Sequence, residues 1–227
     1  MTVENETMQN ETMQNETTQE PRLGVDVIGF GVGEFAYLLN VFEGPCRDRS
    51  VGVFRAADMV DDVTLSTAGA SSLMARDMAS IDDDGDLGVK GVAAAVATAL
   101  GTATRWTEVS LLTGDTMDNV VLIEAPGVAL MLQPRLLGTW FVFAQDPAIS
   151  SAEATLRLVR RHVEQHAGGS AYLVVKTLDA EQHLLVRREA SSWTTGIPDF
   201  AADEVTETEG LDDGGLLRAI EDIRGQA

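Results

Sequence analysis

The chain has 227 residues, of which 44% are apolar, enough to build one domain of ordinary size around a substantial core. Its formal net charge of −20 and the near absence of lysine, with only Lys90 and Lys176, are typical of proteins from salt-adapted hosts. Basic clusters are too short for a nucleic-acid partner, and no apolar run reaches the roughly 18 residues of a membrane span. The polar, acidic N-terminus differs from a secretory signal, so we predict a cytoplasmic protein.

The chain divides into three parts by composition. Residues 1–20 repeat the polar unit Asn-Glu-Thr-Met-Gln without apolar periodicity, which predicts a disordered head. Residues 21–190 are expected to form a single α/β domain. Residues 191–227 form an acidic tail, irregular to residue 210, with a short amphipathic helix over 213–224 whose docking place the sequence leaves open.

The first elements of the domain surround a glycine-rich run. Residues 23–28 are predicted to form a short strand, and the apolar spacing over 34–42 predicts a helix that ends at Gly44-Pro45. Residues 50–54 are expected to form a second strand, and residues 58–80 fit either strand or helix.

The middle of the chain begins with an aspartate-rich turn at 82–86. Its carboxylates are expected to cap an Ala/Val-rich helix over 87–100, which either breaks at Gly101 or continues towards Leu112. The same aspartates could bind a cation, but their spacing does not match an EF-hand loop, so the solvated cap is favoured.

The clearest pattern is a meander of three strands over 119–124, 128–132 and 139–144, whose short links require antiparallel pairing. A capping box at 150–153 then predicts a helix, and residues 171–187 are predicted to form a hairpin.

The glycines Gly29, Gly31 and Gly33 follow a predicted strand and precede a predicted helix, a context that suits a nucleotide loop. The run from Val27 to Ala36 resembles the first motif of Rossmann-like methyltransferases, which would make these glycines a site for S-adenosylmethionine or a nucleotide. The sequence departs from this motif at two positions. Val27 stands where the family has an acidic residue two positions before the first glycine, and Arg55 stands where the family has an acidic residue after the second strand. A purely structural glycine turn is the favoured interpretation.

No other residues form a recognisable catalytic or metal site. His162 and His166 are spaced i, i+4, as a metal pair would be, but no third ligand is evident, and we interpret them as surface histidines. Cys46 is the only cysteine, and no nucleophile stands beside an identifiable base, so no catalytic residue and no metal ligand is assigned.

The order of an Ala-rich helix, a meander and a helix over residues 87–168 resembles the roadblock/LC7 family of GTPase-associated proteins. The matching segments are 92–100, 119–124, 128–132, 140–146 and 154–161. The resemblance implies a five-stranded antiparallel sheet between helices, a homodimer, and a small GTPase as partner. The two strands that the family has before this helix are poorly evident at 50–81, and the hairpin at 171–187 is additional.

The links within the meander decide between the two resemblances. Only 14 residues separate the strands at 119–124 and 139–144, and 128–132 is itself a strand, so a crossover helix has no room. We therefore predict an α/β (α+β) fold with an antiparallel-rich sheet and packed helices, and a non-enzymatic regulatory or scaffolding protein that forms a homodimer. The alternative is a Rossmann-like domain that binds S-adenosylmethionine or a nucleotide.

Overall fold

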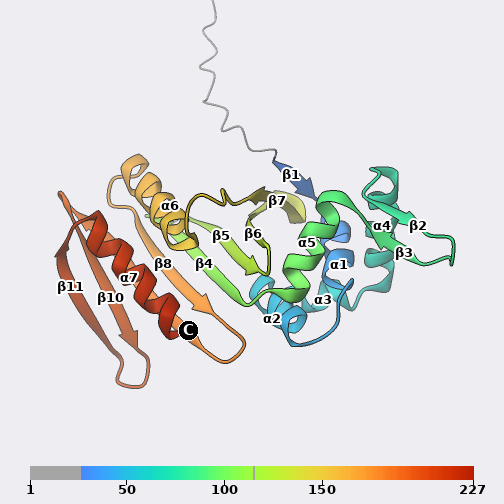
Figure 1. Ribbon diagram of the computed structural model, residues 1–227. Helices are drawn as coiled ribbons and strands as arrows, with labels where there is room; N and C mark the ends of the chain where they lie inside the picture. Colours follow the sequence, from blue (N-terminus) through green and yellow to red (C-terminus); the bar gives the residue numbers. More distant parts are fainter. Residues whose placement is uncertain (1–26, 115) are drawn as a thin grey trace, which may run out of the picture.

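The computed structural model describes residues 27–114 and 116–227 (Figure 1). These residues form an antiparallel sheet covered by helices, which confirms the predicted α/β (α+β) class. The predicted disordered head at 1–20 lies outside the described residues.

The main sheet has nine strands in the described part of the chain, in the order β1-β7-β6-β5-β4-β8-β9-β10-β11, and every neighbouring pair is antiparallel. The strands are β1 (Ile28–Phe30), β4 (Arg105–Thr113), β5 (Thr116–Ala125), β6 (Val128–Arg135), β7 (Thr139–Ala144), β8 (Ser170–Lys176), β9 (Glu181–Glu189), β10 (Ser192–Asp199) and β11 (Glu204–Leu211). A separate hairpin pairs β2 (Ala79–Ile81) with β3 (Leu87–Val89).

Seven α-helices lie between or after these strands in the described residues. They are α1 (Val32–Leu39), α2 (Pro45–Phe54), α3 (Ala57–Val60), α4 (Val63–Ala75), α5 (Gly91–Thr102), α6 (Ser151–Gln165) and α7 (Asp213–Gln226). A short 3-10 turn, η1 (Leu136–Gly138), links β6 to β7. Strands β4 to β7 followed by α6, and strands β8 to β11 followed by α7, form two successive units that meet at the β4–β8 pair.

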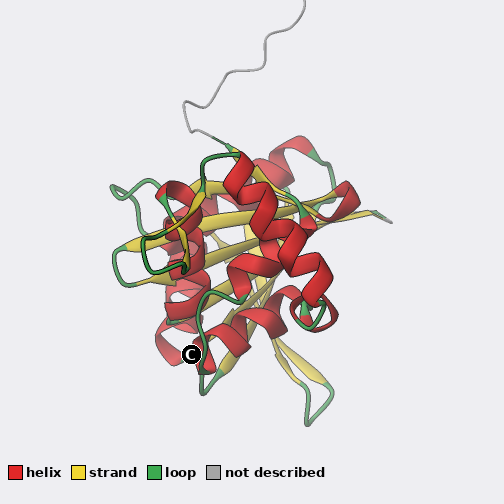
Figure 2. Cartoon of the chain, turned by 90° about the vertical axis from the view of Figure 1, so that its right-hand side faces the viewer, coloured by secondary structure: helices red, strands yellow, loops and turns green. Residues whose placement is uncertain are grey.

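The helices cover opposite faces of the two halves of the sheet, as strand β5 demonstrates. Successive side chains of a strand point to opposite faces. Val121 and Ile123 pack in a core with α1, α2 and α5, whereas Val120 and Leu122 pack in a second core with α6 and α7. Figure 1 shows the two helix groups over different halves, and Figure 2 shows helices on both sides of the strands. Each half therefore has one face without a helix layer.

Several predicted elements are confirmed. The meander forms as β5, β6 and β7, and the predicted hairpin forms as β8 and β9. Ser150 caps α6 by accepting a hydrogen bond from the backbone N–H of Glu153 at 3.1 Å. The terminal helix also forms and docks on its own chain, with Leu216 and Ile220 fully buried in the second core.

The strand predicted at 50–54 is wrong, because these residues form the end of helix α2. Its buried residues Ser50, Val53 and Phe54 have helical spacing. The buried hydroxyl of Ser50 donates to the carbonyl of Leu100 at 2.6 Å and accepts from Trp106 Nε1 at 3.0 Å. Pro45 was expected to follow the end of the helix predicted over 34–42. It instead lies in the first turn of α2, where its missing N–H leaves no helical hydrogen bond unmade.

The irregular structure predicted for 191–210 is also wrong, because these residues form β10 and β11. Strand β11 is the outermost strand and is exposed on nearly its whole length, so its glutamates remain solvated. Charged residues on an edge strand also discourage pairing with other chains. Strand β10 pairs with β9 across residue 190, where the sequence placed the end of the domain.

The start of the Ala-rich helix also differs from the prediction. Residues 87–89 form strand β3, and helix α5 begins at Gly91 and ends at Thr102, so the continuation towards Leu112 does not occur. Within residues 27–114 and 116–227 the main sheet has nine strands, whereas the roadblock/LC7 resemblance implies five, and residues 50–81 form mostly helices where that resemblance expects strands.

Candidate functional site

The glycine run lies at the edge of the sheet. Gly29 is in β1, which pairs antiparallel with β7, and Gly31 caps the N-terminus of α1. The backbone N–H of Gly31, which a phosphate would need, donates to the carboxylate of Glu34 at 2.9 Å. Gly33 lies against Gly69 of α4, and a Cβ at Gly33 would stand 2.9 Å from the carbonyl oxygen of Leu65. Gly31 and Gly33 thus have roles in the fold, and cofactor binding by the three glycines remains a prediction.

Glu34 holds this region together. Its carboxylate accepts hydrogen bonds from Ser72 at 2.7 Å and from Arg76 at 2.6 Å, and Arg76 also reaches the carbonyl of Gly29 at 3.1 Å. Burial raises the pKa of Glu34, but the hydrogen bonds and the charge of Arg76 outweigh it, so the pKa lies below its ordinary value. The ionised carboxylate is therefore part of the packing between α1 and α4.

The aspartate cluster at 82–86 does not cap helix α5, contrary to expectation. It forms the turn between β2 and β3, where Asp82 accepts hydrogen bonds from the backbone N–H groups of Asp84 and Asp86. The residue before α5 is Lys90, whose side chain makes no capping hydrogen bond. Within the described residues, no group of three His, Cys, Asp or Glu side chains could hold a metal ion.

The two histidines of α6 lie in different environments. His162 is buried, which corrects the prediction of a surface residue, whereas His166 is exposed at the end of the helix. Nε2 of His162 lies 2.9 Å from the carbonyl oxygen of Leu112, and a carbonyl only accepts, so this nitrogen carries the proton. His162 thereby fastens α6 to β4, and the rings of His162 and His166 are 4.9 Å apart.

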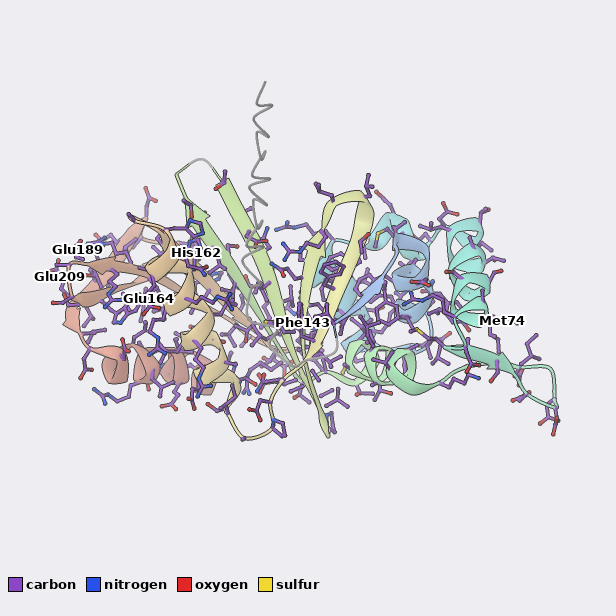
Figure 3. The ribbon with its side chains drawn as sticks, turned by 90° about the horizontal axis from the view of Figure 1, so that it is seen from above. Met74, Phe143, His162, Glu164, Glu189 and Glu209 are labelled. Carbon is purple, nitrogen blue, oxygen red and sulfur yellow. The ribbon has the colours of Figure 1, made fainter. Side chains whose placement is uncertain are left out.

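A groove runs between helix α6 and the face of β5, β6 and β7 that carries no helix layer. Its volume is about 580 Å³. The sheet contributes Met131 and Phe143, the helix contributes Leu158, and all three are only partly buried. Figure 3 marks the positions of Phe143 and His162 on these two elements. An apolar floor left partly open is the general form of a binding site.

Charged groups border the groove. Asp118 accepts a hydrogen bond from Gln133 at 2.9 Å and lies 3.8 Å from Arg135, whose guanidinium is also 5.8 Å from the centre of the Phe141 ring. On the opposite side, Arg161 is exposed and forms no ion pair with any described residue. Although the whole protein is acidic, cations therefore outnumber carboxylates in this groove.

The hairpin between β6 and β7, next to the groove, carries two leucines in solvent. Leu136 is 90% exposed and Leu137 is 96% exposed. Leu137 also has a left-handed backbone with φ of 61°, a conformation that suits glycine or asparagine better. Two adjacent solvated leucines in a left-handed turn make this hairpin a candidate contact surface.

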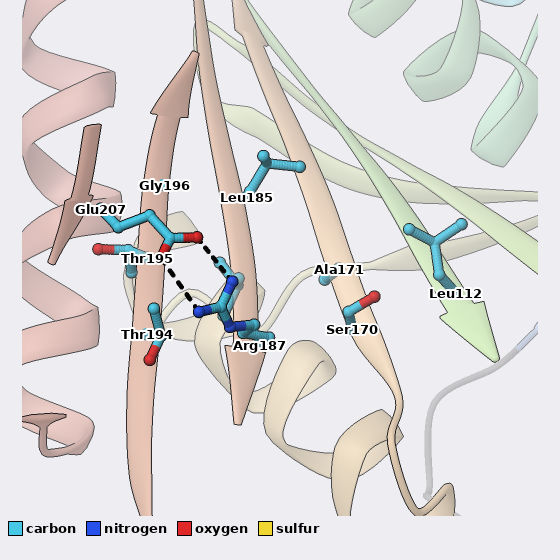
Figure 4. A pocket seen from close by; sticks show the side chains of 10 residues that line it. Leu112, Ser170, Ala171, Leu185, Arg187, Thr194, Thr195, Gly196 and Glu207 are labelled. Carbon is cyan, nitrogen blue, oxygen red and sulfur yellow. Dashed lines mark hydrogen bonds and ion pairs between the residues drawn. The ribbon is translucent and has the colours of Figure 1, made fainter. Parts of the chain in front are cut away.

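The face without helices in the second half of the sheet offers a smaller pocket of about 180 Å³ (Figure 4). Its charged residues Arg187 and Glu207 satisfy each other through two hydrogen bonds of 2.6 and 3.1 Å. Further along this face, the hydroxyl of Tyr172 lies 2.6 Å from Nδ1 of His183. Burial and the nearby carboxylates of Glu181 and Glu108 raise the pKa of Tyr172. These groups satisfy one another, which leaves the groove beside α6 as the stronger candidate.

Comparison with known proteins gives no family for this chain, since no protein-family model and no curated protein matches it. Among the described residues, no helix combines the length and apolar character that a membrane crossing requires. Sequence reasoning missed the groove, because its lining comes from segments far apart in the chain. The one signal available was the apolar pair Leu136-Leu137 inside a predicted turn.

Proposed function

We propose that this protein is a non-enzymatic regulatory or scaffolding protein that binds other polypeptides and forms a homodimer in the cytoplasm of a salt-adapted host. The observation that carries the proposal is the pair of solvated leucines, Leu136 and Leu137, beside a partly apolar groove. A surface of this kind costs solubility, and binding another chain is the function that offsets the cost. A small GTPase is the partner that the roadblock/LC7 resemblance suggests.

The competing function is binding of S-adenosylmethionine or a nucleotide at Gly29, Gly31 and Gly33. Two observations favour the scaffold instead. The strand that carries Gly29 is an antiparallel edge strand rather than a central parallel one, and the N–H of Gly31 is taken by Glu34. Calorimetry with S-adenosylmethionine is expected to show no binding heat, and tight binding by a monomer would reverse this preference.

The double variant L136S/L137N tests the proposal in molar KCl by light scattering. Asparagine suits the left-handed backbone at position 137, so the variant is expected to fold with an unchanged melting temperature. We expect a dimer for the wild type and a monomer for the variant, because the apolar contact is lost. A monomeric wild type, or a variant that dimerises as well as the wild type, contradicts the proposal.

A further inference from the structure

We propose that the groove beside α6 binds an acidic peptide segment of a partner protein, one that carries bulky apolar side chains between its carboxylates. This inference rests on the proposed function and names the chemistry of the partner. The groove has an apolar floor and a cationic border, and each of these features selects for one property of the ligand.

The apolar floor selects for a bulky side chain. Met131 and Phe143 come from β6 and β7; Met131 packs at the margin of the second core, whereas Phe143 belongs to neither core. Leu158 of α6 faces them across the groove. The flexible side chain of a methionine adapts to ligands of different shape, as is common on surfaces that receive peptides. Apolar side chains of a partner would remove this area from water.

The border selects for carboxylates. The described residues that line the groove include two arginines, Arg135 and Arg161, and one acid, Asp118. Asp118 is already held by Gln133 and Arg135, so it adds little repulsion. Arg161 is exposed and has no ion-pair partner among the described residues. In a chain of net charge −20, a local excess of arginine over carboxylate is complementary to acidic partners at contact distance.

Arg161 and Arg157 provide a matched comparison. Both are exposed arginines of α6, but only Arg161 lines the groove, while Arg157 pairs with Glu153 one turn away. The variants R161Q and R157Q remove the same charge from the same helix. A non-specific electrostatic attraction would weaken equally in both variants, and a groove contact would weaken only in R161Q.

The experiment measures fluorescence anisotropy with the full chain and a labelled ten-residue peptide of alternating Glu and Leu. A peptide of alternating Gln and Leu is the control. We expect saturable binding of the Glu peptide, weakened at least about threefold by R161Q and by less than about 1.5-fold by R157Q. The Gln peptide is expected to bind at least about threefold more weakly than the Glu peptide.

Four results overturn the inference. The first is absence of saturable binding by the Glu peptide, and the second is equal weakening in both arginine variants. The third is tighter binding of anionic lipid vesicles, or of a synthetic peptide of residues 1–20, than of the Glu peptide. The fourth is a monomeric R161Q variant combined with no peptide binding by the wild type, because the groove would then be the interface between two copies of this chain. A dimer that depends on Leu136 and Leu137, together with no peptide binding, would refute this inference and leave the proposed function standing.

Discussion

The close contact between Gly33 of α1 and Gly69 of α4 leads to a stability prediction that can be worked from distances. A Cβ added to Gly69 would lie 1.8 Å from the carbonyl oxygen of Gly33 and 2.6 Å from the backbone nitrogen of Glu34. Both are backbone atoms, so the clash is relieved only by moving a helix. Overpacking of this kind costs about 1–3 kcal/mol and occasionally more.

The size of the effect follows from two opposing contributions. Alanine is favoured over glycine in a helix by about 1 kcal/mol, which partly offsets the clash in G69A. Since the clash lies at the severe end, we expect G69A to lower the free energy of unfolding by at least about 2 kcal/mol. At Gly52, in the exposed part of α2, an added Cβ meets nothing within 4 Å, so G52A is expected to stabilise by about 0.5–1 kcal/mol.

Urea unfolding followed by tryptophan fluorescence measures both variants, because Trp106 and Trp193 are fully buried, one in each core. G33A is expected to fall between them, since its Cβ would approach backbone atoms to 2.9 Å rather than 1.8 Å. Equal stability of G69A and G52A would refute the close packing of α1 on α4. It would also reopen the interpretation of Gly33 as part of a ligand loop.

Two further variants test charged groups inside the fold. The pKa of Glu34 is lowered in the native state, so its carboxylate stabilises the fold above pH about 5 and this contribution is lost as the pH falls through the native pKa. E34Q should therefore flatten the decline of the urea midpoint between about pH 5 and pH 3, and an unchanged decline would contradict the assignment. Arg224 is buried and donates to Thr107 and Glu124, so R224M is expected to cost about 2–3 kcal/mol, against less than about 0.5 kcal/mol for the exposed R157Q in the same urea unfolding assay. Similar costs for these two variants would show that Arg224 contributes little.

The elements that could be predicted from the sequence are those whose signals are local. Strands β5, β6 and β7 follow from alternating apolar runs joined by links too short for a crossover. Helix α6 follows from Ser150 and Glu153, because a capping box requires only neighbouring residues. Local rules of this kind hold wherever tertiary contacts agree with them.

The elements that were mispredicted depend on distant contacts. Residues 50–54 look like a strand because Val51 and Val53 alternate with small residues, yet Ser50 and Phe54 are buried by packing against partners elsewhere in the chain. Strand β11 looks irregular because glutamates interrupt it, and only its place at the sheet edge explains why they are tolerated.

The candidate groove could not have been predicted, because it depends on which face of each half-sheet the helices cover. Leu158 and Phe143 come from separate elements, α6 and β7, and both line the groove because of the path that the chain takes after β7. The sequence did contain the leucine pair at 136–137, but not its position next to the groove.

Photo-crosslinking tests most directly whether an acidic peptide binds in the groove beside α6. The alternating Glu and Leu peptide, carrying a benzophenone group in place of one Leu, is irradiated with the full chain, and mass spectrometry locates the attached residues. We expect attachment at Met131, Phe143 or Leu158, and less of it in R161Q. Attachment concentrated instead on the opposite open face, at Leu185 or Val205, would contradict the account.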